Sequence, residues 1–249
     1  SFSCIRLLYK TYKWIVCSFL MSKRSKVFAV VPAYNEEKRI SKAIKDLKKY
    51  KYNIVVVDDS SIDNTVKVVN KFRNIILVEQ KVNRGQGAAL RVGIKRALKE
   101  GADIIVTFDG DGQHQAKEIS ELVAPIEAGI SDISLGSRFL DKKTDMPLSR
   151  KILLGGSVWV ERIFFGIKLS DAHNGFRAMS RSAAKKIRIT EDRMAHASEI
   201  IKEISRNGLR YNEVPVKIIY NKDTIENGTG SYRTAIGVLF KIVGWRLFG

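Results

Sequence analysis

A pair of aspartates separated by one glycine is the feature of this sequence best suited to chemistry. Asp109 and Asp111 lie in the run TFDGDGQH, directly after the apolar or β-prone stretch 104–108. Two carboxylates at this spacing, in a glycine-rich turn behind a strand, form an oxygen-rich site that suits a divalent cation holding a phosphorylated ligand. The same letters also fit a polar β-turn, because Asp-Gly is a common hairpin signal. Both interpretations stay open on this segment alone.

Alternating strands and helices are expected to position the two aspartates. Strands are predicted over residues 27–31, 54–57, 75–78, 104–108 and 133–135. Helices are predicted over residues 35–50, from 63–65 onward, and over 83–99 and 116–128. Continuous apolar strands that alternate with helices predict an α/β fold, with a mostly parallel central sheet and helices on both faces. The first helix should bury a face made of Ile40, Ala43, Ile44 and Leu47.

Three polar segments directly follow predicted strands, at residues 32–36, 58–61 and 109–113. Ligands of such sheets bind at the carboxyl ends of the strands, so these segments are expected to line one site. A glycine pair at Gly85 and Gly87 lacks the third glycine of the dinucleotide fingerprint and is not in the first strand-to-helix turn. Close packing of a helix start against the sheet is the other interpretation of this pair.

The composition is that of a soluble globular protein with an unusual charge. The chain has 249 residues, of which 45% are hydrophobic, and 44 Lys+Arg against 26 Asp+Glu give a net charge of +18. Such an excess predicts an anionic partner: a nucleic acid, an anionic membrane surface or a phosphorylated substrate. Nucleic acid is the weakest of these, because the basic residues are spread over many helices without an aromatic stripe. Both cysteines, Cys4 and Cys17, lie near the start, which fits a reducing, cytoplasmic setting.

Three apolar segments allow more than one interpretation. Residues 1–21 differ from the rest and are expected to be an extension outside the fold, with an interfacial membrane helix as the alternative. Residues 152–169 would be a core helix or a helix lying against lipid. Residues 232–249 fit a basic amphipathic helix on an anionic membrane surface, or a terminal helix packed on the domain.

Six short motifs occur in order between residues 26 and 220. They are VPAYNE at 31–36, VDDSS at 57–61, NRGQGA at 83–88, FDGDGQH at 108–114, GSR at 136–138 and DAHNGFR at 171–177. Together they resemble the family 2 glycosyltransferases with the GT-A fold, in the branch of dolichol-phosphate mannose synthase and bacterial polyprenyl-phosphate sugar transferases. The resemblance implies one GT-A domain over residues 22–249, with a nucleotide-sugar-binding half at 26–140 and an acceptor half at 141–231.

The resemblance also implies a role for each site residue. Asp111 and Gln113 would bind Mg²⁺ or Mn²⁺, and Arg138 would face the diphosphate or the acceptor phosphate. The nucleotide-sugar would be held by Pro32, Tyr34, Glu36, Val57, Asp59, Asp109, Gly110, Asp111 and Arg138.

The implied reaction is an inverting transfer of a sugar from a nucleotide donor to a dolichyl or undecaprenyl phosphate. The enzyme would sit peripherally on the cytoplasmic face of the membrane, where a small membrane protein could dock it, and it would bind no nucleic acid. An acceptor phosphate is already anionic and needs little help from a base. The alternative acceptor, a hydroxyl of a lipid-linked or surface glycan, would need a base, and Asp171 or Glu199 is expected to supply it. His196, three residues before Glu199, is expected to be a hydrogen-bonded structural residue.

Overall fold

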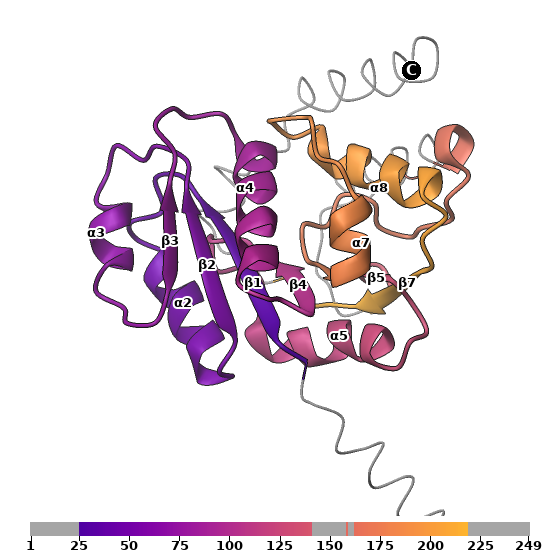
Figure 1. Ribbon diagram of the computed structural model, residues 1–249, viewed down its shortest axis with the longest axis horizontal. Helices are drawn as coiled ribbons and strands as arrows, with labels where there is room; N and C mark the ends of the chain where they lie inside the picture. The colour runs from indigo at the N-terminus through magenta and orange to yellow at the C-terminus, as the bar shows by residue number, and fades with distance from the viewer. Residues whose placement is uncertain (1–24, 141–157, 159–161, 219–249) are drawn as a thin grey trace, which may run out of the picture.

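The computed structural model describes residues 25–140, 158 and 162–218. The predicted extension over 1–21 and the predicted amphipathic helix over 232–249 lie outside the described residues, as does half of segment 152–169. The described residues form one seven-stranded sheet with helices on both faces, which confirms the predicted α/β architecture (Figure 1). Among these residues, no helix combines the length and the apolar character needed to cross a membrane.

The strands are β1 (Val27–Ala33), β2 (Asn53–Asp58), β3 (Ile76–Glu79), β4 (Ile104–Thr107), β5 (Ile133–Ser137), β6 (Arg177–Ser180) and β7 (Tyr211–Pro215). They are ordered β3-β2-β1-β4-β6-β5-β7 across the sheet. The helices are α2 (Ile40–Lys49), α3 (Thr65–Val69), α4 (Gln86–Lys99), the 3₁₀ turn η1 (Ala116–Glu118), α5 (Ile119–Glu127), α7 (Arg181–Lys186) and α8 (His196–Arg206). The predicted strands and helices up to residue 135 are therefore all present, although several bounds differ.

Strand β6 runs antiparallel to both of its neighbours, whereas every other pairing in the described sheet is parallel. Strand β6 was not expected from the sequence, because its four residues, RAMS, contain no apolar run. The reversed direction has a consequence for the site. Strand β6 starts at the edge where the parallel strands end, and its first residue, Arg177, pairs with Thr107 at the end of β4. The preceding segment 171–176 therefore reaches that edge.

Helix α2 starts at Ile40, five residues later than the prediction of a helix from Asn35. Asn35 adopts a left-handed backbone conformation with φ of 55°. The backbone N–H groups of Asn35 and Glu36 donate to the hydroxyls of Ser61 (2.9 Å) and Thr65 (2.8 Å). These bonds join the segment to residues 61–65, and the left-handed conformation of Asn35 is incompatible with a helix that starts there.

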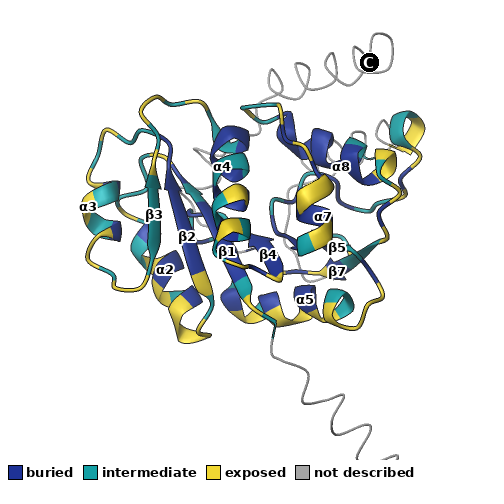
Figure 2. Cartoon of the chain, in the orientation of Figure 1, coloured by how far each residue is buried: buried dark blue, intermediate teal, exposed yellow. Residues whose placement is uncertain are grey.

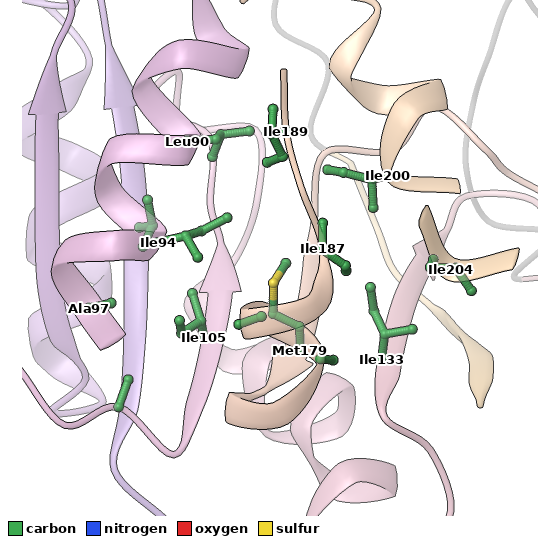
Figure 3. Close-up of a cluster of buried hydrophobic side chains, with 14 of the residues drawn as sticks. Leu90, Ile94, Ala97, Ile105, Ile133, Met179, Ile187, Ile189, Ile200 and Ile204 are labelled. Atoms are coloured by element: carbon green, nitrogen blue, oxygen red, sulfur yellow. The ribbon is translucent and has the colours of Figure 1, made fainter. Parts of the chain in front are cut away.

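Two hydrophobic clusters hold the layers together. One joins the sheet to α4, α7 and α8, and Figure 3 shows Leu90, Ile94, Met179 and Ile200 meeting in it. The other joins the opposite sheet face to α2, α3 and α5. Figure 2 shows the central strands β2, β1 and β4 mostly buried between these layers, whereas the edge strand β3 is intermediate. The predicted buried face of α2 is confirmed, because Ile40, Ala43, Ile44 and Leu47 are all at most 2% exposed.

Helix α4 packs closely on two different partners. At Gly93 an added Cβ would lie 2.3 Å from a methyl group of Val30, so the helix touches the sheet there. At Gly87 an added Cβ would lie 2.0 Å from the backbone oxygen of Glu191, and at Gly85 it would lie 2.7 Å from that of Asp192. The glycine pair therefore does allow close packing at the helix start, but its partner is the segment 191–192 and not the sheet.

Replacing Gly87 by Ala is expected to destabilise the protein by about 1–3 kcal/mol, because a backbone carbonyl has to move to make room. The better helix propensity of Ala offsets about 1 kcal/mol of strain at most. Urea unfolding of Gly87→Ala beside Lys95→Ala, at an exposed position of α4, measures the effect. A Gly87→Ala variant as stable as the control would show that segment 191–192 does not pack as described.

Candidate active site

The end of the sheet collects the three polar segments that the sequence placed there. Strands β2, β1 and β4 are neighbours in the sheet, so the segments that follow them, 58–61, 32–36 and 109–113, lie along one edge. The predicted convergence is confirmed. Segment 171–176 joins them from β6, where the Thr107 hydroxyl donates to the carbonyl of Gly175.

Asp109 is held on both carboxylate oxygens. The Gln86 amide donates to Oδ1 (3.0 Å), and Nε2 of His114 lies 3.0 Å from Oδ2. The His114 ring is itself stacked on Phe176, with 4.7 Å between the ring centroids. Burial would raise the pKa of Asp109, but the His114 hydrogen bond and nearby cationic groups outweigh it and hold that pKa below its usual range. Asp109 is therefore a fixed, ionised carboxylate.

Asp111 and Glu36 lie close enough to Asp109 for the negative charges of the three carboxylates to repel one another. Burial and the neighbouring charge of Asp109 raise the pKa of Asp111. Burial, with smaller contributions from Asp111 and Asp109, raises the pKa of Glu36 to about 7, even though Arg39 donates to both Glu36 oxygens (2.7 and 3.1 Å). Each raised pKa means that the ionised form of the carboxyl is unfavourable at its position. A bound cation would stabilise that ionised form. Among the described residues, no three His, Cys, Asp or Glu side chains are grouped to hold a metal ion by themselves.

The raised pKa of Glu36 predicts a pH-dependent cost in stability. Below the unfolded pKa of 4.5, the Glu36 carboxyl is protonated in both states and costs no stability. As the pH rises from there through about 7, the unfolded state ionises more readily than the folded state, so the folded protein loses stability. The variant Glu36→Gln should therefore gain stability relative to the wild type between pH 5 and pH 7.5. Urea unfolding of both proteins at both pH values measures this difference. The contributions of His173 and His196 cancel in it, because the wild type and the variant share both residues. An unchanged difference would contradict the raised pKa.

The residues expected to hold the nucleotide have different environments. The Asp59 carboxylate accepts hydrogen bonds from Gln80 Nε2 (2.9 Å) and from the backbone N–H groups of Arg84 (3.0 Å) and Gly85 (2.6 Å). It thus shapes the loop between β3 and α4. The Val57 side chain is fully buried in the core, so its expected contact with a nucleotide is restricted to the backbone.

Asp58, which the sequence did not single out as a binding residue, has an unsatisfied acceptor beside this loop. Its Oδ2 accepts from the backbone N–H of Ser61 (3.0 Å), whereas its buried Oδ1 has no hydrogen-bond partner in the described part of the chain. A buried acceptor without a partner is costly and therefore suits a donor group of a ligand. Tyr34 is 45% exposed beside β1. Gly110 packs tightly, since an added Cβ would lie 3.1 Å from the carbonyl of Pro32.

Arg138 and Asp171 form a buried ion pair. Nε and Nη2 of Arg138 donate to the two Asp171 oxygens (2.6 and 2.7 Å), and the Arg138 backbone N–H adds a third bond (3.1 Å). The side chains are 9% and 0% exposed. A base must present an open lone pair to the acceptor, and Asp171 presents both oxygens to Arg138. The geometry does not support the expected base role for Asp171, so we assign it to positioning Arg138.

Glu199 is also used by the fold. Its carboxylate accepts hydrogen bonds from the backbone N–H groups of Thr190 (2.9 Å) and Glu191 (2.9 Å) and from the Thr190 hydroxyl. It is 7% exposed, at the start of α8. These bonds hold the segment that packs on Gly85 and Gly87. The geometry does not support the expected base role for Glu199 either.

His196 is buried and His173 is half-buried in the same part of the fold. Burial is the main reason that the pKa values of His173 and His196 fall to about 4, and the positive charge of Arg177 lowers both further. Both rings are therefore neutral at pH 7. Nδ1 of His196 lies 2.8 Å from the carbonyl oxygen of Arg193, to which it donates. His196 is thus hydrogen-bonded, as expected from the sequence.

The family model for Glycosyl transferase family 2 matches residues 28–188, more than half of the chain. The chain belongs to this family. Among its relatives is the UDP-N-acetylglucosamine–dolichyl-phosphate N-acetylglucosaminyltransferase of Methanococcus voltae, 34% identical over 82% of this chain and 89% of the relative. Another is the polyprenol monophosphomannose synthase of Mycolicibacterium smegmatis, 26% identical over 90% of this chain and 88% of the relative. The resemblance to the polyprenyl-phosphate branch of family 2 is thereby supported.

Solved structures agree on the fold of this family 2 chain. The glucosyl-3-phosphoglycerate synthase of Mycobacterium tuberculosis, in complex with Mn²⁺ and UDP-glucose, superposes with a TM-score of 0.67. The match covers 89% of this chain and 80% of that one at 20% identity. The expected GT-A fold is therefore confirmed.

Three contacts of the family 2 site were not predicted from the sequence: those of Gln86, His114 and Asp58. Gln86 and His114 belong to the motifs NRGQGA and FDGDGQH, so the signal was their place in those motifs. Their shared contact with Asp109 needs the fold, because 28 residues of chain separate them along the sequence. Asp58 and Asp59 look alike in the sequence, and only their hydrogen bonds separate the two roles.

Proposed function

We propose that this family 2 enzyme transfers one sugar, with inversion at the anomeric carbon, from a nucleotide-diphosphate sugar to a polyprenyl phosphate. The enzyme would act peripherally at the inner face of a membrane. The observation that carries the proposal is the group formed by Glu36, Asp109 and Asp111 at the carboxyl ends of the strands. Two of these carboxyls have raised pKa values, and the third is fixed by two hydrogen bonds. Such a group suits a metal-bound diphosphate.

A divalent cation, Mg²⁺ or Mn²⁺, fits these residues. Its preferred ligands are hard oxygens, and such ions are often held by one or two carboxylates together with substrate phosphates. Asp111 and Gln113 would hold it. When bound, it would neutralise the negative charge that develops on the departing diphosphate. The Mn²⁺ of the M. tuberculosis structure supports this choice.

The chain's own residues would position the donor. Asp109, fixed by Gln86 and His114, would accept a hydrogen bond from the ribose or the donor sugar. The free acceptor of Asp58 would receive a donor group of the nucleotide. The exposed ring of Tyr34 would lie against the base. A rigid site of this kind lowers the barrier because the reacting groups need little reorganisation.

A phosphate acceptor agrees better with the site than a hydroxyl acceptor. A phosphate oxygen attacks the anomeric carbon as an anion, the bond to the nucleoside diphosphate breaks, and no proton has to be removed. Both carboxyls that the sequence nominated as bases, Asp171 and Glu199, are engaged in hydrogen bonds within the fold. Arg138, next to Asp171, would meet phosphate oxygens. The printed names of the two relatives also support a dolichyl or polyprenyl phosphate acceptor.

A thermal-shift panel tests the donor and the metal together. The full chain is heated with UDP-, GDP- and dTDP-sugars in the presence of Mn²⁺, Mg²⁺ or EDTA. UDP-N-acetylglucosamine is the first donor to test because the M. voltae relative is named for it. One nucleotide class should raise the melting temperature only with a divalent ion, since a ligand stabilises the state that binds it. If no donor shifts the melting temperature in any metal, the proposed function fails.

A further inference from the structure

The outer face of α2 carries a row of lysines. Lys42, Lys45 and Lys49 are exposed and lie within about 60° of one another around the helix, at about 100° per residue. Lys38, in the turn before the helix, is exposed and continues the row. The buried face, which includes Ile40 and Ala43, points to the sheet. Figure 2 shows this division on α2 between buried and exposed residues.

Some cations of the opposite helix layer are paired with acids of the fold. There, Arg91 pairs with Asp192 (2.7 Å), and Arg96 pairs with Glu100 (2.8 Å). On α2, none of Lys42, Lys45 and Lys49 takes part in an ion pair within the described part of the chain. The acid of α2, Asp46, is occupied by the backbone N–H of Ala116 (2.7 Å). The positive charge of the row is therefore available to an external anion.

The neighbouring helix extends the charged surface. Helix α3 packs beside α2 on the same face of the sheet (Figure 1). It exposes Lys67, and the turn that follows it exposes Lys71. Over residues 40–51 and 65–73 together, eight Lys or Arg residues stand against one Asp. At the other end, the row adjoins the site, because an added Cβ at Gly112 would lie 3.7 Å from Cδ of Lys42. The surface thus runs from the turn around Asp111 along α2.

We infer that this lysine surface docks the enzyme on an anionic membrane, and the inference rests on the proposed lipid acceptor. Each Lys or Arg near an anionic bilayer adds to the attraction between the protein and the bilayer. A membrane on this surface would bring lipid phosphates to the rim of the site next to Asp111. A nucleic acid is a weaker match, because Tyr50 at the end of the helix stacks on Tyr52 (6.4 Å, 24°) rather than presenting both ring faces.

Vesicle co-sedimentation of the full chain tests the docking surface. The vesicles are phosphatidylcholine alone or with about 30% phosphatidylglycerol. The triple variant Lys42→Gln, Lys45→Gln, Lys49→Gln is compared with the control Lys95→Gln, Lys99→Gln, Lys185→Gln, which removes the same charge from exposed positions of the opposite layer. We expect the α2 variant to partition at least about tenfold more weakly onto anionic vesicles, and the control to change by less than about threefold.

Equal losses in both triple variants would overturn the inference, because bulk charge would then explain binding. Wild-type partition retained by the α2 variant would overturn it too. The same holds if the α2 variant loses affinity for duplex DNA and not for vesicles. Circular dichroism checks that both variants are folded. Transfer by the wild-type chain in detergent needs no docking, so its absence reports failure of the proposed function separately.

Discussion

Replacing Asp111 by Asn is expected to lower the rate of sugar transfer about 10³-fold, without destabilising the free protein. The loss follows because Asp111 would hold the cation that stabilises the leaving diphosphate. The free protein should keep or gain stability at pH 7.5, since burial and the charge of Asp109 already disfavour ionised Asp111. Asn removes that charge at nearly constant volume. Transfer assays and thermal unfolding, with and without Mn²⁺, measure the two effects.

A structural role for Asp111 would give a different pair of results. The variant would then melt below the wild type and lose activity in proportion to unfolding. Glu121→Gln, at an exposed acid of α5, is the matched control and should change neither quantity. Transfer by Asp111→Asn within tenfold of the wild type would show that the cation is held elsewhere.

Replacing Asp171 by Asn is expected to cost about 3–5 kcal/mol of stability, the largest effect on folding that the site predicts. The neutral amide would leave the guanidinium of Arg138 buried without its counter-charge, and the side chain of Arg138 is only 9% exposed. Urea unfolding measures the cost. The result separates positioning from base catalysis, because a general base replaced by Asn would lower transfer while the melting temperature stayed near the wild-type value.

The double variant Arg138→Met with Asp171→Leu is the control for this pair. Buried ion pairs can often be replaced by apolar residues of similar volume without a loss of stability. The double variant should therefore regain most of the stability that Asp171→Asn loses. It should remain inactive if Arg138 meets a phosphate, as we propose. A double variant as unstable as the single one would show that residues 138 and 171 do more than pair with each other.

Local patterns were sufficient to predict the frame of the site. Apolar runs that end in polar turns located β1, β2 and β4, and their order along a parallel sheet placed the turns at one edge. The carboxylate pair Asp109 and Asp111 fitted either a turn or a cation site by itself, and the other strand-end segments at the same edge favoured the site. These features depend on residues near one another in the chain.

The remaining features depend on partners far apart in the chain. Whether a carboxyl is a base or a structural acceptor depends on which groups reach it, and Arg138 reaches Asp171 from 33 residues away. Strand β6 forms because β4 and β5 pair with it, which its own four residues do not signal. Likewise, the segment that contains Glu36 is held by Ser61 and Thr65 with Asn35 in a left-handed conformation, and the helix begins only at Ile40. Such tertiary competition cannot be read from local periodicity.

The central claim is transfer from a nucleotide-sugar to a lipid phosphate, and one assay tests it most directly. The full chain is incubated in detergent with dolichyl phosphate, Mn²⁺ and the radiolabelled donor that stabilises it in the thermal-shift panel. The lipid extract is then treated with mild acid. We predict label in the lipid fraction that requires Mn²⁺ and is released as free sugar by the acid, because a glycosyl phosphate is acid-labile. Label that survives the acid, or that appears only on a glycan hydroxyl, would contradict the account.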